Sequence, residues 1–234
     1  MPTPPAQAGA NIYSTNLSEY ERKYKQGYGL TVPDGHVIRI HHQILRYELK
    51  VPGGNLLDFG CGTGTHAKWL AENGNWTPFG CDISATAIEA AKKQMPQWAR
   101  NFVVCDSLPD LSSLFKEKFD FVFTNQVLYY FDNAQLRRIV EEFYSLLNPG
   151  GLFFASMMAR ENYYFSRSFE MPGSEMRKVE LRGRLNDTTY INFKGTTEME
   201  DDFRMFKKLH VGYYDTIIRE DEGSTKHIWY LGKK

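Results

Sequence analysis

The chain has 234 residues, with 28 basic and 28 acidic side chains that leave no formal net charge. This length predicts one domain with an elaboration, or two small domains, and the zero net charge argues against a dominant nucleic-acid-binding surface. Because no apolar run is long enough to span a membrane and no signal peptide is present, we expect a cytoplasmic protein without membrane partners. Cys61, Cys81 and Cys105 have no disulfide-framework spacing, which also favours a reducing compartment.

The N-terminal part of the chain precedes any regular alternation of elements. Residues 1–10 are rich in Pro and Ala and are expected to form a disordered tail. Residues 11–54 are expected to form a helical lid, in which apolar residues at near-helical spacing predict a helix over 37–49.

An alternation of strands and helices begins at residue 55 and continues to residue 158. Ser84 and Asp132 stand where two of the helices should begin, and Gln135 makes the second a variant of the capping box. Alternation of this kind predicts a parallel sheet with helices on both faces. The predicted strands cover residues 55–59, 76–82, 101–105, 119–124 and 152–158.

A glycine-rich turn separates the first predicted strand from its helix. Glycines stand at alternate positions 60, 62 and 64, and Asp58 precedes them. Glycine allows a sharp bend and lets a ligand approach without a Cβ in the way, and the helix start offers free N–H groups. The spacing differs from the dinucleotide-binding pattern G-x-G-x-x-G, because Thr65 stands where the third glycine would fall.

The C-terminal third of the chain departs from the alternation. Residues 159–196 lack a clear period and are interpreted as a substrate-side insert, with strand-like stretches at 179–181 and 188–193. Residues 197–234 are expected to complete the core. A helix is predicted from Thr197 to about Leu209, followed by two antiparallel strands over 210–219 and 226–231.

The motif D-x-G-x-G-x-G after a strand resembles the first motif of the class I S-adenosylmethionine (SAM) methyltransferases. The closing antiparallel pair is the usual finish of that fold, so the resemblance, to the small-molecule type, covers roughly residues 37–234. It implies an α/β, Rossmann-like methyltransferase fold, with a mostly parallel seven-stranded sheet, an antiparallel last strand and helices on both faces. Residues 55–158 would then be the SAM-binding core.

The resemblance also implies contacts to each part of S-adenosyl-L-methionine. The glycine turn would face the ribose and methionine, and an acid after the second strand would accept from the ribose hydroxyls, with an apolar neighbour against the adenine. An acid after the third strand would accept from the adenine amino group, and two amides after the fourth would line the cleft. A lone Asp after a strand is more often a turn residue, so the interpretation depends on finding both acids. The glycine turn contributes Gly60, Cys61, Gly62 and Gly64, and the second strand is followed by Asp82 and Ile83. The third strand is followed by Asp106 and Ser107, and the fourth by Asn125 and Gln126.

Catalysis requires little beyond geometry when the methyl group is already activated on a sulfonium, because proximity and orientation supply much of the rate. A base is needed only if the acceptor must lose a proton early. Members of this family often place acceptor-contacting residues after the fourth strand, which indicates Tyr129 and Tyr130. His41 is the third candidate catalytic residue, with His36 and His42 as alternatives. No cluster has metal-ligand spacing, so no metal is expected.

The acceptor is inferred from what the sequence lacks. Residues 124–127, Thr-Asn-Gln-Val, stand in place of the Asn/Asp-Pro-Pro-Tyr of nucleic-acid amino-methylating enzymes. We therefore expect a small polar acceptor and no nucleic acid, with the protein a monomer or homodimer. The acceptor would be anionic if lid arginines recognise it, for example a sugar or phosphorylated metabolite of surface-polysaccharide or natural-product synthesis. An NAD-dependent oxidoreductase and a SAM-binding module without catalysis remain as alternatives. The lid arginines are Arg39, Arg160, Arg167, Arg177, Arg182 and Arg184.

Overall fold

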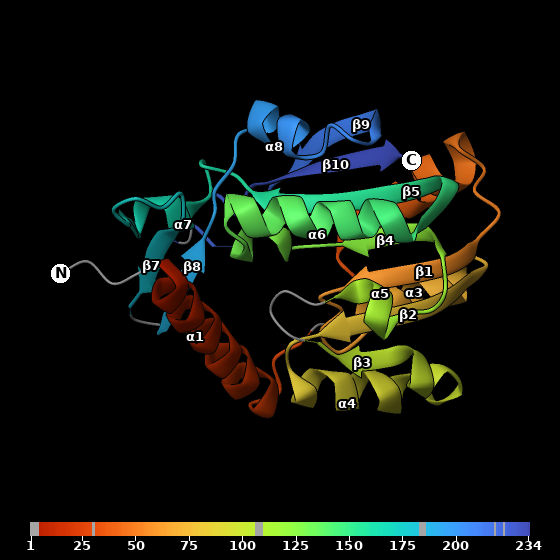
Figure 1. Cartoon of the computed structure of the whole chain (residues 1–234), viewed down its shortest axis with the longest axis horizontal. Coiled ribbons are helices and arrows are strands. Elements are labelled where there is room, and N and C mark those ends of the chain that lie inside the picture. The colour runs from red at the N-terminus through yellow and green to blue at the C-terminus, as the bar shows by residue number, and fades with distance from the viewer. Residues whose placement is uncertain (1–4, 30, 106–109, 183–185, 218, 222) are drawn as a thin grey trace.

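A seven-stranded sheet with the order β3-β2-β1-β4-β5-β10-β9 forms the centre of the structure, a computed structural model (Figure 1). Strands β1 to β5 are parallel, and β10 runs antiparallel to both β5 and the edge strand β9. The predicted sheet is therefore confirmed, including the antiparallel last strand. The strands are β1 (Gly54–Phe59), β2 (Trp76–Asp82), β3 (Phe102–Val104), β4 (Phe119–Thr124), β5 (Leu147–Met158), β9 (Lys207–Tyr214) and β10 (His227–Lys233).

The structure describes residues 5–29, 31–105, 110–182, 186–217, 219–221 and 223–234. None of the helices in these ranges combines the length and the apolar character that crossing a bilayer requires. The α-helices are α1 (Pro5–Lys25), α2 (Gly35–Ile40), α3 (Thr65–Asn73), α4 (Ala85–Gln94), α5 (Leu111–Leu114), α6 (Asn133–Leu146), α7 (Tyr163–Ser166) and α8 (Thr196–Asp202). The π-helix η1 (His41–Glu48) and the 3₁₀ helices η2 (Pro96–Asn101) and η3 (Leu128–Tyr130) complete the set.

The strands send alternate side chains to opposite faces of the sheet, as the period of two requires. Leu57 and Phe153 are buried in the cluster that contains α5, α6 and α8, whereas Leu56 and Phe154 are buried with α2, η1 and α3. Burying a Leu or Phe side chain stabilises the fold by about 1.5–3 kcal/mol. The helices on both faces are thus held by the two sides of the same strands.

Both helix caps predicted from the sequence are present. The Ser84 hydroxyl accepts a hydrogen bond from the Ala87 N–H at 3.1 Å. Asp132 and Gln135 form a full capping box at the start of α6, because each side chain accepts from the other residue's N–H, at 2.8 and 3.1 Å. Such caps satisfy N–H groups that the first turn of a helix leaves free.

The insert forms a second, three-stranded antiparallel sheet made of β6 (Ser168–Glu170), β7 (Arg177–Leu181) and β8 (Asp187–Ile191). The sequence indicates strands near β7 and β8, but it gives no signal for β6. Helix α1 lies diagonally between this small sheet and α4 in Figure 1, and it contacts both β8 and α4. The small sheet and α1 lie on the side toward which the C-terminal ends of β1 and β2 point (Figure 1), and we call them the lid.

Three element boundaries differ from the sequence prediction. Helix α1 begins at Pro5, inside the segment 1–10 that was expected to be a disordered tail. The predicted helix over 37–49 is divided into α2 and the π-helix η1. Helix α8 begins after Gly195, whose N–H donates to the Glu198 carboxylate at 2.8 Å, and it ends at Asp202, where the turn to β9 begins.

Candidate active site

A cavity of about 1860 Å³ lies beyond the C-terminal ends of β1, β2 and β4, under the lid. In open α/β sheets this is the edge where ligands bind. Residues of the glycine turn, the ends of β2 and β4, the lid and the β9–β10 pair all line the cavity. The volume exceeds that of typical small-ligand pockets, about 300–1,000 Å³, so it has room for two ligands at once.

The glycine turn lies at the cavity wall in a conformation that other residues rarely adopt. Gly60 has φ +73°, and a Cβ there would come within 2.3 Å of Val127 Cγ2. Gly60, Cys61 and Gly62 line the cavity, as predicted. Gly64 is not among its lining residues. It packs against α4 instead, where a Cβ would meet Met95 Cε at 2.6 Å, so its role is to let α3 start close to α4.

Asp82 connects the end of β2 to this turn. Its Oδ2 accepts from the Gly62 N–H and its Oδ1 from the Ser84 N–H, both at 2.9 Å. Burial raises the pKa of this carboxyl, although the backbone N–H donors oppose the shift. Asp82 and Ile83 both line the cavity. Each carboxylate oxygen keeps a further lone pair, so Asp82 can accept from two ligand hydroxyls while it holds the turn in place.

Two predicted residues cannot be placed. Asp106 and Ser107 lie outside the described residues. Their neighbour Cys105 lines the cavity, and its N–H donates to the Asp82 carbonyl at 3.0 Å. The third strand therefore reaches the cavity beside Asp82.

Asp58 lies beneath the turn rather than at the cavity surface. It is 2% exposed, and its carboxylate accepts from the Ala67 N–H at the start of α3. Its Oδ2 has no hydrogen-bond partner among the described residues. Burial raises the pKa of Asp58 to about 7, against the opposing charge of His66. The geometry fits a residue that organises the glycine turn.

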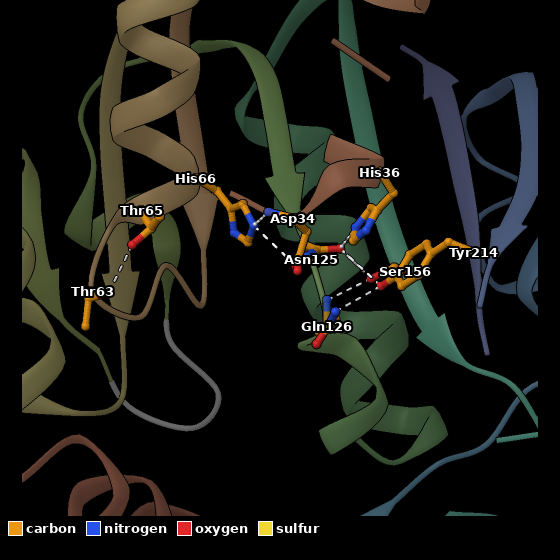
Figure 2. A network of polar contacts seen from close by, with 9 residues as sticks. All are labelled: Asp34, His36, Thr63, Thr65, His66, Asn125, Gln126, Ser156 and Tyr214. Atoms are coloured by element: carbon orange, nitrogen blue, oxygen red, sulfur yellow. Dashed lines mark hydrogen bonds and ion pairs between the residues drawn. The ribbon is translucent and has the colours of Figure 1, made fainter. Parts of the chain in front are cut away.

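A polar network centred on Asn125 forms the other side of the cavity (Figure 2). Asn125 Oδ1 lies 3.0 Å from both His36 Nε2 and Ser156 Oγ, and 3.5 Å from the Tyr214 hydroxyl. Asn125 Nδ2 lies 3.4 Å from Asp34 Oδ2. The carboxamide thus joins three elements around the cavity.

Gln126 extends this network through a strained backbone. It has φ +61°, which is uncommon for a residue other than glycine and costs free energy. The backbone N–H of Gln126 donates to the Ser156 hydroxyl at 2.7 Å. The side-chain amide of Gln126 donates to the Tyr214 hydroxyl at 3.2 Å. Asn125 and Gln126 both line the cavity, as the sequence predicts.

Residues 57–153 match the family described as "Methyltransferase domain". This part of the chain is a methyltransferase domain. The matched segment includes the glycine turn, Asp82 and the Asn125–Gln126 pair. The predicted resemblance to class I methyltransferases is confirmed.

Curated relatives of the chain include two methyltransferases from different organisms. The chain is 35% identical over 114 residues to an uncharacterized methyltransferase of Synechocystis sp., with 48% of this chain and 51% of the relative covered. It is 31% identical over 120 residues to a probable tRNA methyltransferase 9B of Bos taurus, with 50% and 24% covered. The chain thus spans about half the length of the first relative and about a quarter of the second.

Solved structures share the fold over nearly the whole chain. A SAM-dependent methyltransferase from Anabaena variabilis superposes with a TM-score of 0.67 at 17% identity, over 95% of this chain and 94% of that one. The N-methyltransferase NodS from Bradyrhizobium japonicum, in complex with S-adenosyl-L-homocysteine (SAH), gives 0.62 at 17% identity, over 94% and 98%. The lid and the β9–β10 pair therefore belong to the same fold as the methyltransferase domain.

Tyr129 and Tyr130 of the methyltransferase domain both line the cavity, as predicted. The Tyr130 hydroxyl is hydrogen-bonded to the hydroxyl of Tyr20 in α1. Burial raises the pKa of both Tyr129 and Tyr130 well above the usual phenol value. Both phenols are therefore protonated at neutral pH, and they can donate a hydrogen bond but do not accept a proton.

The prediction of His41 as a catalytic residue is wrong in this structure. His41 is 3% exposed and is not among the residues that line the cavity. It packs edge-on against Trp69 of α3, between η1 and the sheet. Five residues earlier, His36 does line the cavity, which makes it the histidine of this segment that a ligand can reach.

The arginines expected to recognise an anion are mostly held elsewhere. Arg160, Arg177 and Arg182 pair with the carboxylates of Glu198, Glu170 and Glu180. Arg184 lies outside the described residues. Among the described arginines, only Arg39 lines the cavity. Three of the five described arginines in this set thus pair with carboxylates of the chain itself.

The last two strands bring to the cavity two residues that the sequence pattern does not indicate. Tyr214 of β9 is paired directly with His227 of β10, and both line the cavity. Burial lowers the pKa of His227 to about 4, so its ring is neutral at physiological pH. The predicted antiparallel pairing was the available signal, because it places the end of one strand opposite the start of the next.

Proposed function

We propose that the chain is a SAM-dependent methyltransferase that methylates a small polar molecule in the cavity. The observation that carries this proposal is the hydrogen bond between the Asp82 carboxylate and the Gly62 N–H at the cavity wall, within a methyltransferase domain. When bound, the cofactor supplies a methyl group activated by a positively charged sulfur. The G-x-G-x-G spacing favours this cofactor over NAD.

The residues present fit each part of the cofactor. The second lone pairs of the Asp82 carboxylate can accept from the two ribose hydroxyls. Gly60 and Gly62 let the turn pass close to Val127 and Tyr24, because a Cβ at either position would overlap these side chains. Arg39, an exposed cation on the cavity wall with no ion-pair partner among the described residues, is suited to the carboxylate of the methionine part. Tyr24 of α1 lies against Gly62 and covers this end of the cavity.

The lid supports a small acceptor rather than a polymer. Helix α1 is tied to β8 by the Lys23–Asp187 ion pair at 2.5 Å and by the Thr189–Asn16 hydrogen bond at 3.1 Å. All four residues line the cavity, so an acceptor bound there lies against these contacts. Several curated relatives carry tRNA or ribosomal RNA methyltransferase names, so RNA is the alternative acceptor that the experiment has to test.

The charges around the cavity favour a neutral acceptor, such as a sugar or another hydroxylated metabolite. Arg160, Arg177 and Arg182 are paired with carboxylates, and Arg39 is the only described arginine that lines the cavity, so a phosphorylated acceptor has little to bind. Three buried, free cysteines support a reducing, cytoplasmic location. A monomer or homodimer is the simplest assembly consistent with a cavity built from one chain.

Calorimetry with SAH and with 5′-methylthioadenosine, which lacks the amino-acid part, tests cofactor binding directly. Asp82→Asn should weaken both ligands roughly 10- to 100-fold, because a hydrogen bond to a charged group contributes about 1.5–3 kcal/mol. Asp201→Asn, which removes an exposed ion pair with Arg204, is the matched control and should change nothing. Binding of NADH without SAH would contradict the cofactor assignment.

The acceptor class is tested with deuterated-methyl SAM and two pools, a small-molecule cell extract and total RNA. Mass spectrometry should find labelled products in the small-molecule pool. Labelled RNA alone would contradict the small-molecule proposal while leaving the methyltransferase assignment intact. SAH binding without labelled product in either pool would favour a SAM-binding module without catalysis.

A further inference from the structure

We propose that His36 is the general base of this site and that the acceptor is a neutral hydroxyl compound, an alcohol or a phenol. This inference rests on the proposed methyltransferase function and specifies its substrate class and its proton acceptor. It is carried by the way in which Asn125, Tyr214 and Asp34 fix the His36 ring (Figure 2).

The orientation of the Asn125 carboxamide follows from its neighbours. Ser156 Oγ accepts from the Gln126 N–H at 2.7 Å, so its own proton is free to be donated to Asn125 Oδ1 at 3.0 Å. On the other side, Asn125 Nδ2 faces the Asp34 carboxylate, which can only accept. Asn125 therefore presents its oxygen, and not its nitrogen, to His36.

This orientation selects the tautomer of His36. Because Asn125 Oδ1 has no proton, the His36 Nε2 that lies 3.0 Å from it must carry the hydrogen. The lone pair of the neutral ring is then on Nδ1. A histidine held by a carbonyl oxygen on one nitrogen and basic at the other is the arrangement of a positioned general base.

Stacking holds the ring in the plane that this hydrogen bond requires. The His36 and Tyr214 rings lie parallel, with centroids 3.6 Å apart and 9° between planes, and Tyr214 stacks in turn on His227 at 5.2 Å and 12°. Burial lowers the pKa of His36, against the opposing effects of the Asn125 hydrogen bond and the Asp34 charge. The ring is thus neutral and able to accept a proton at physiological pH.

The need for a base is what points to a hydroxyl acceptor. The cavity carboxylates Asp187, Glu175 and Asp215 accept from Lys23, from the Asn133 N–H and from the Thr225 N–H, respectively, while Asp187 Oδ1 has no hydrogen-bond partner among the described residues. An amine attacks as its free base and a carboxylate already carries its charge, so neither needs to lose a proton before it reacts. A hydroxyl enters without charge and loses its proton as it reacts, which is the step that a neutral histidine serves.

The proton and electron balance is simple. As the acceptor oxygen bonds to the methyl carbon, the methyl–sulfur bond breaks and its electron pair stays on sulfur, which becomes a neutral thioether. The hydroxyl proton passes to His36 Nδ1. The imidazolium that results is stabilised by the Asp34 carboxylate, whose pKa is lowered by His66, His36 and Asn125 in spite of its burial.

The first experiment reads the tautomer without any substrate, by ¹⁵N NMR of the full chain labelled at histidine. His36→Gln assigns the His36 signals. At pH 7 we expect a neutral ring protonated at Nε2, and Asn125→Leu should remove that preference. A ring protonated at Nδ1, or an imidazolium at pH 7, would overturn the proposal. The groups that face His36 and could titrate with it are Asp34, His66, Tyr214 and His227.

The second experiment identifies the product with deuterated-methyl SAM, a panel of phenols and alcohols, and amines and carboxylic acids of matched shape. We expect methyl ethers, and we expect His36→Gln to lower kcat by roughly 10²–10⁴-fold while SAH affinity and KM stay near wild type. His42→Gln, outside this cavity, is the control. Methylamines or methyl esters without ethers, or a His36→Gln enzyme above one tenth of wild-type kcat, would refute the proposal. Failure of the wild-type chain to bind SAH would instead refute the proposed function.

Discussion

Glu21 of α1 accepts a hydrogen bond from the Thr86 hydroxyl of α4 at 2.7 Å. The same carboxylate accepts from the Ser84 hydroxyl at 2.7 Å, and Ser84 is also the residue whose N–H donates to Asp82. One acidic side chain of the lid is therefore connected, through a single residue, to the carboxylate proposed to hold the cofactor ribose.

We expect Glu21→Gln to loosen α1 and to weaken SAH binding several-fold. The charge-assisted hydrogen bonds to Thr86 and Ser84 would be reduced to neutral ones, and Tyr24 would then no longer be held against Gly62. Hydrogen exchange of α1 amides and calorimetric SAH affinity measure the two effects. Glu19→Gln is the control, because Glu19 pairs with Arg22 within the same helix. Unchanged hydrogen exchange in α1 would show that the hydrogen bonds of Glu21 do not hold this helix in place.

The same hydrogen bonds make the lid sensitive to acid. The hydrogen bond from Thr86 lowers the pKa of Glu21 below its usual value. A carboxyl with a lowered folded-state pKa stabilises above its unfolded pKa and loses that effect as pH falls through the folded value. Once the intrinsic slowing of amide exchange in acid is corrected for, the protection of α1 amides should therefore decrease below about pH 4.5, and it should decrease less in Glu21→Gln.

Gly60→Ala should destabilise the fold more than Gly173→Ala. Both glycines have φ +73°, so alanine is strained by about 1–2 kcal/mol at each position. At Gly173 a Cβ meets nothing within 4 Å, whereas at Gly60 it would come within 2.3 Å of Val127 Cγ2. Urea denaturation of the two variants gives the difference. Adding Val127→Ala to Gly60→Ala should recover part of the loss, and no recovery would mean that the overlap is relieved in another way.

Asp58 should make stability depend on pH near neutrality. Burial raises its folded-state pKa to about 7, above an unfolded value of about 3.9, so the folded state binds the extra proton between these two values. The free energy of unfolding contributed by this group therefore falls as pH rises from about 4 to 7, by at most roughly 1.4 kcal/mol per pH unit. Asp58→Asn removes this dependence. Denaturation curves of wild type and variant that stay parallel from pH 5 to 8 would contradict it.

Arg39→Gln should weaken binding of the amino-acid half of the cofactor and leave binding of the adenosyl half unchanged. If its guanidinium binds the methionine carboxylate, the variant loses affinity for SAH by about 10-fold or more, as expected for a charged hydrogen bond. Its affinity for 5′-methylthioadenosine, which has no carboxylate, should stay the same. Equal losses for both ligands would place Arg39 at another part of the site.

The sequence predicted the sheet and the cofactor side of the site because both depend on local signals. The alternation of strands and helices, the glycine spacing and the caps at Ser84 and Asp132 each act over a few residues. Asp82 and Asn125 were predicted to lie at the cavity because the carboxyl ends of parallel strands meet at one edge. For these residues, a place directly after a predicted parallel strand was enough to predict a place at the cavity.

The prediction of His41 as a catalytic residue conflicts with its position on the helix. Val37, His41 and Leu45 are four residues apart and are all buried, at 2%, 3% and 2% exposed. Residues at this spacing share one face of a helix, so the apolar stripe already placed His41 in the core. His36 lies five positions earlier, roughly 140° away around an α-helix, and it therefore faces the cavity instead.

The lid and the far wall could not be predicted for a different reason. Strand β6 has three residues and finds its partner only when β7 is in place. The ion pair between Lys23 and Asp187 joins residues 164 positions apart. Contacts of this separation leave no local pattern in the sequence, because they depend on how the completed elements pack.

The order of the strands in the chain divides the cavity between an early and a late part of the sequence. The glycine turn, Asp82 and the Asn125–Gln126 pair all lie before residue 127, whereas the stacked rings of Tyr214 and His227 belong to the final hairpin. That hairpin pairs with β5 in the same sheet, and a domain folds as a unit. A chain that stops short of the hairpin therefore lacks both an edge of its sheet and the wall against which His36 stacks.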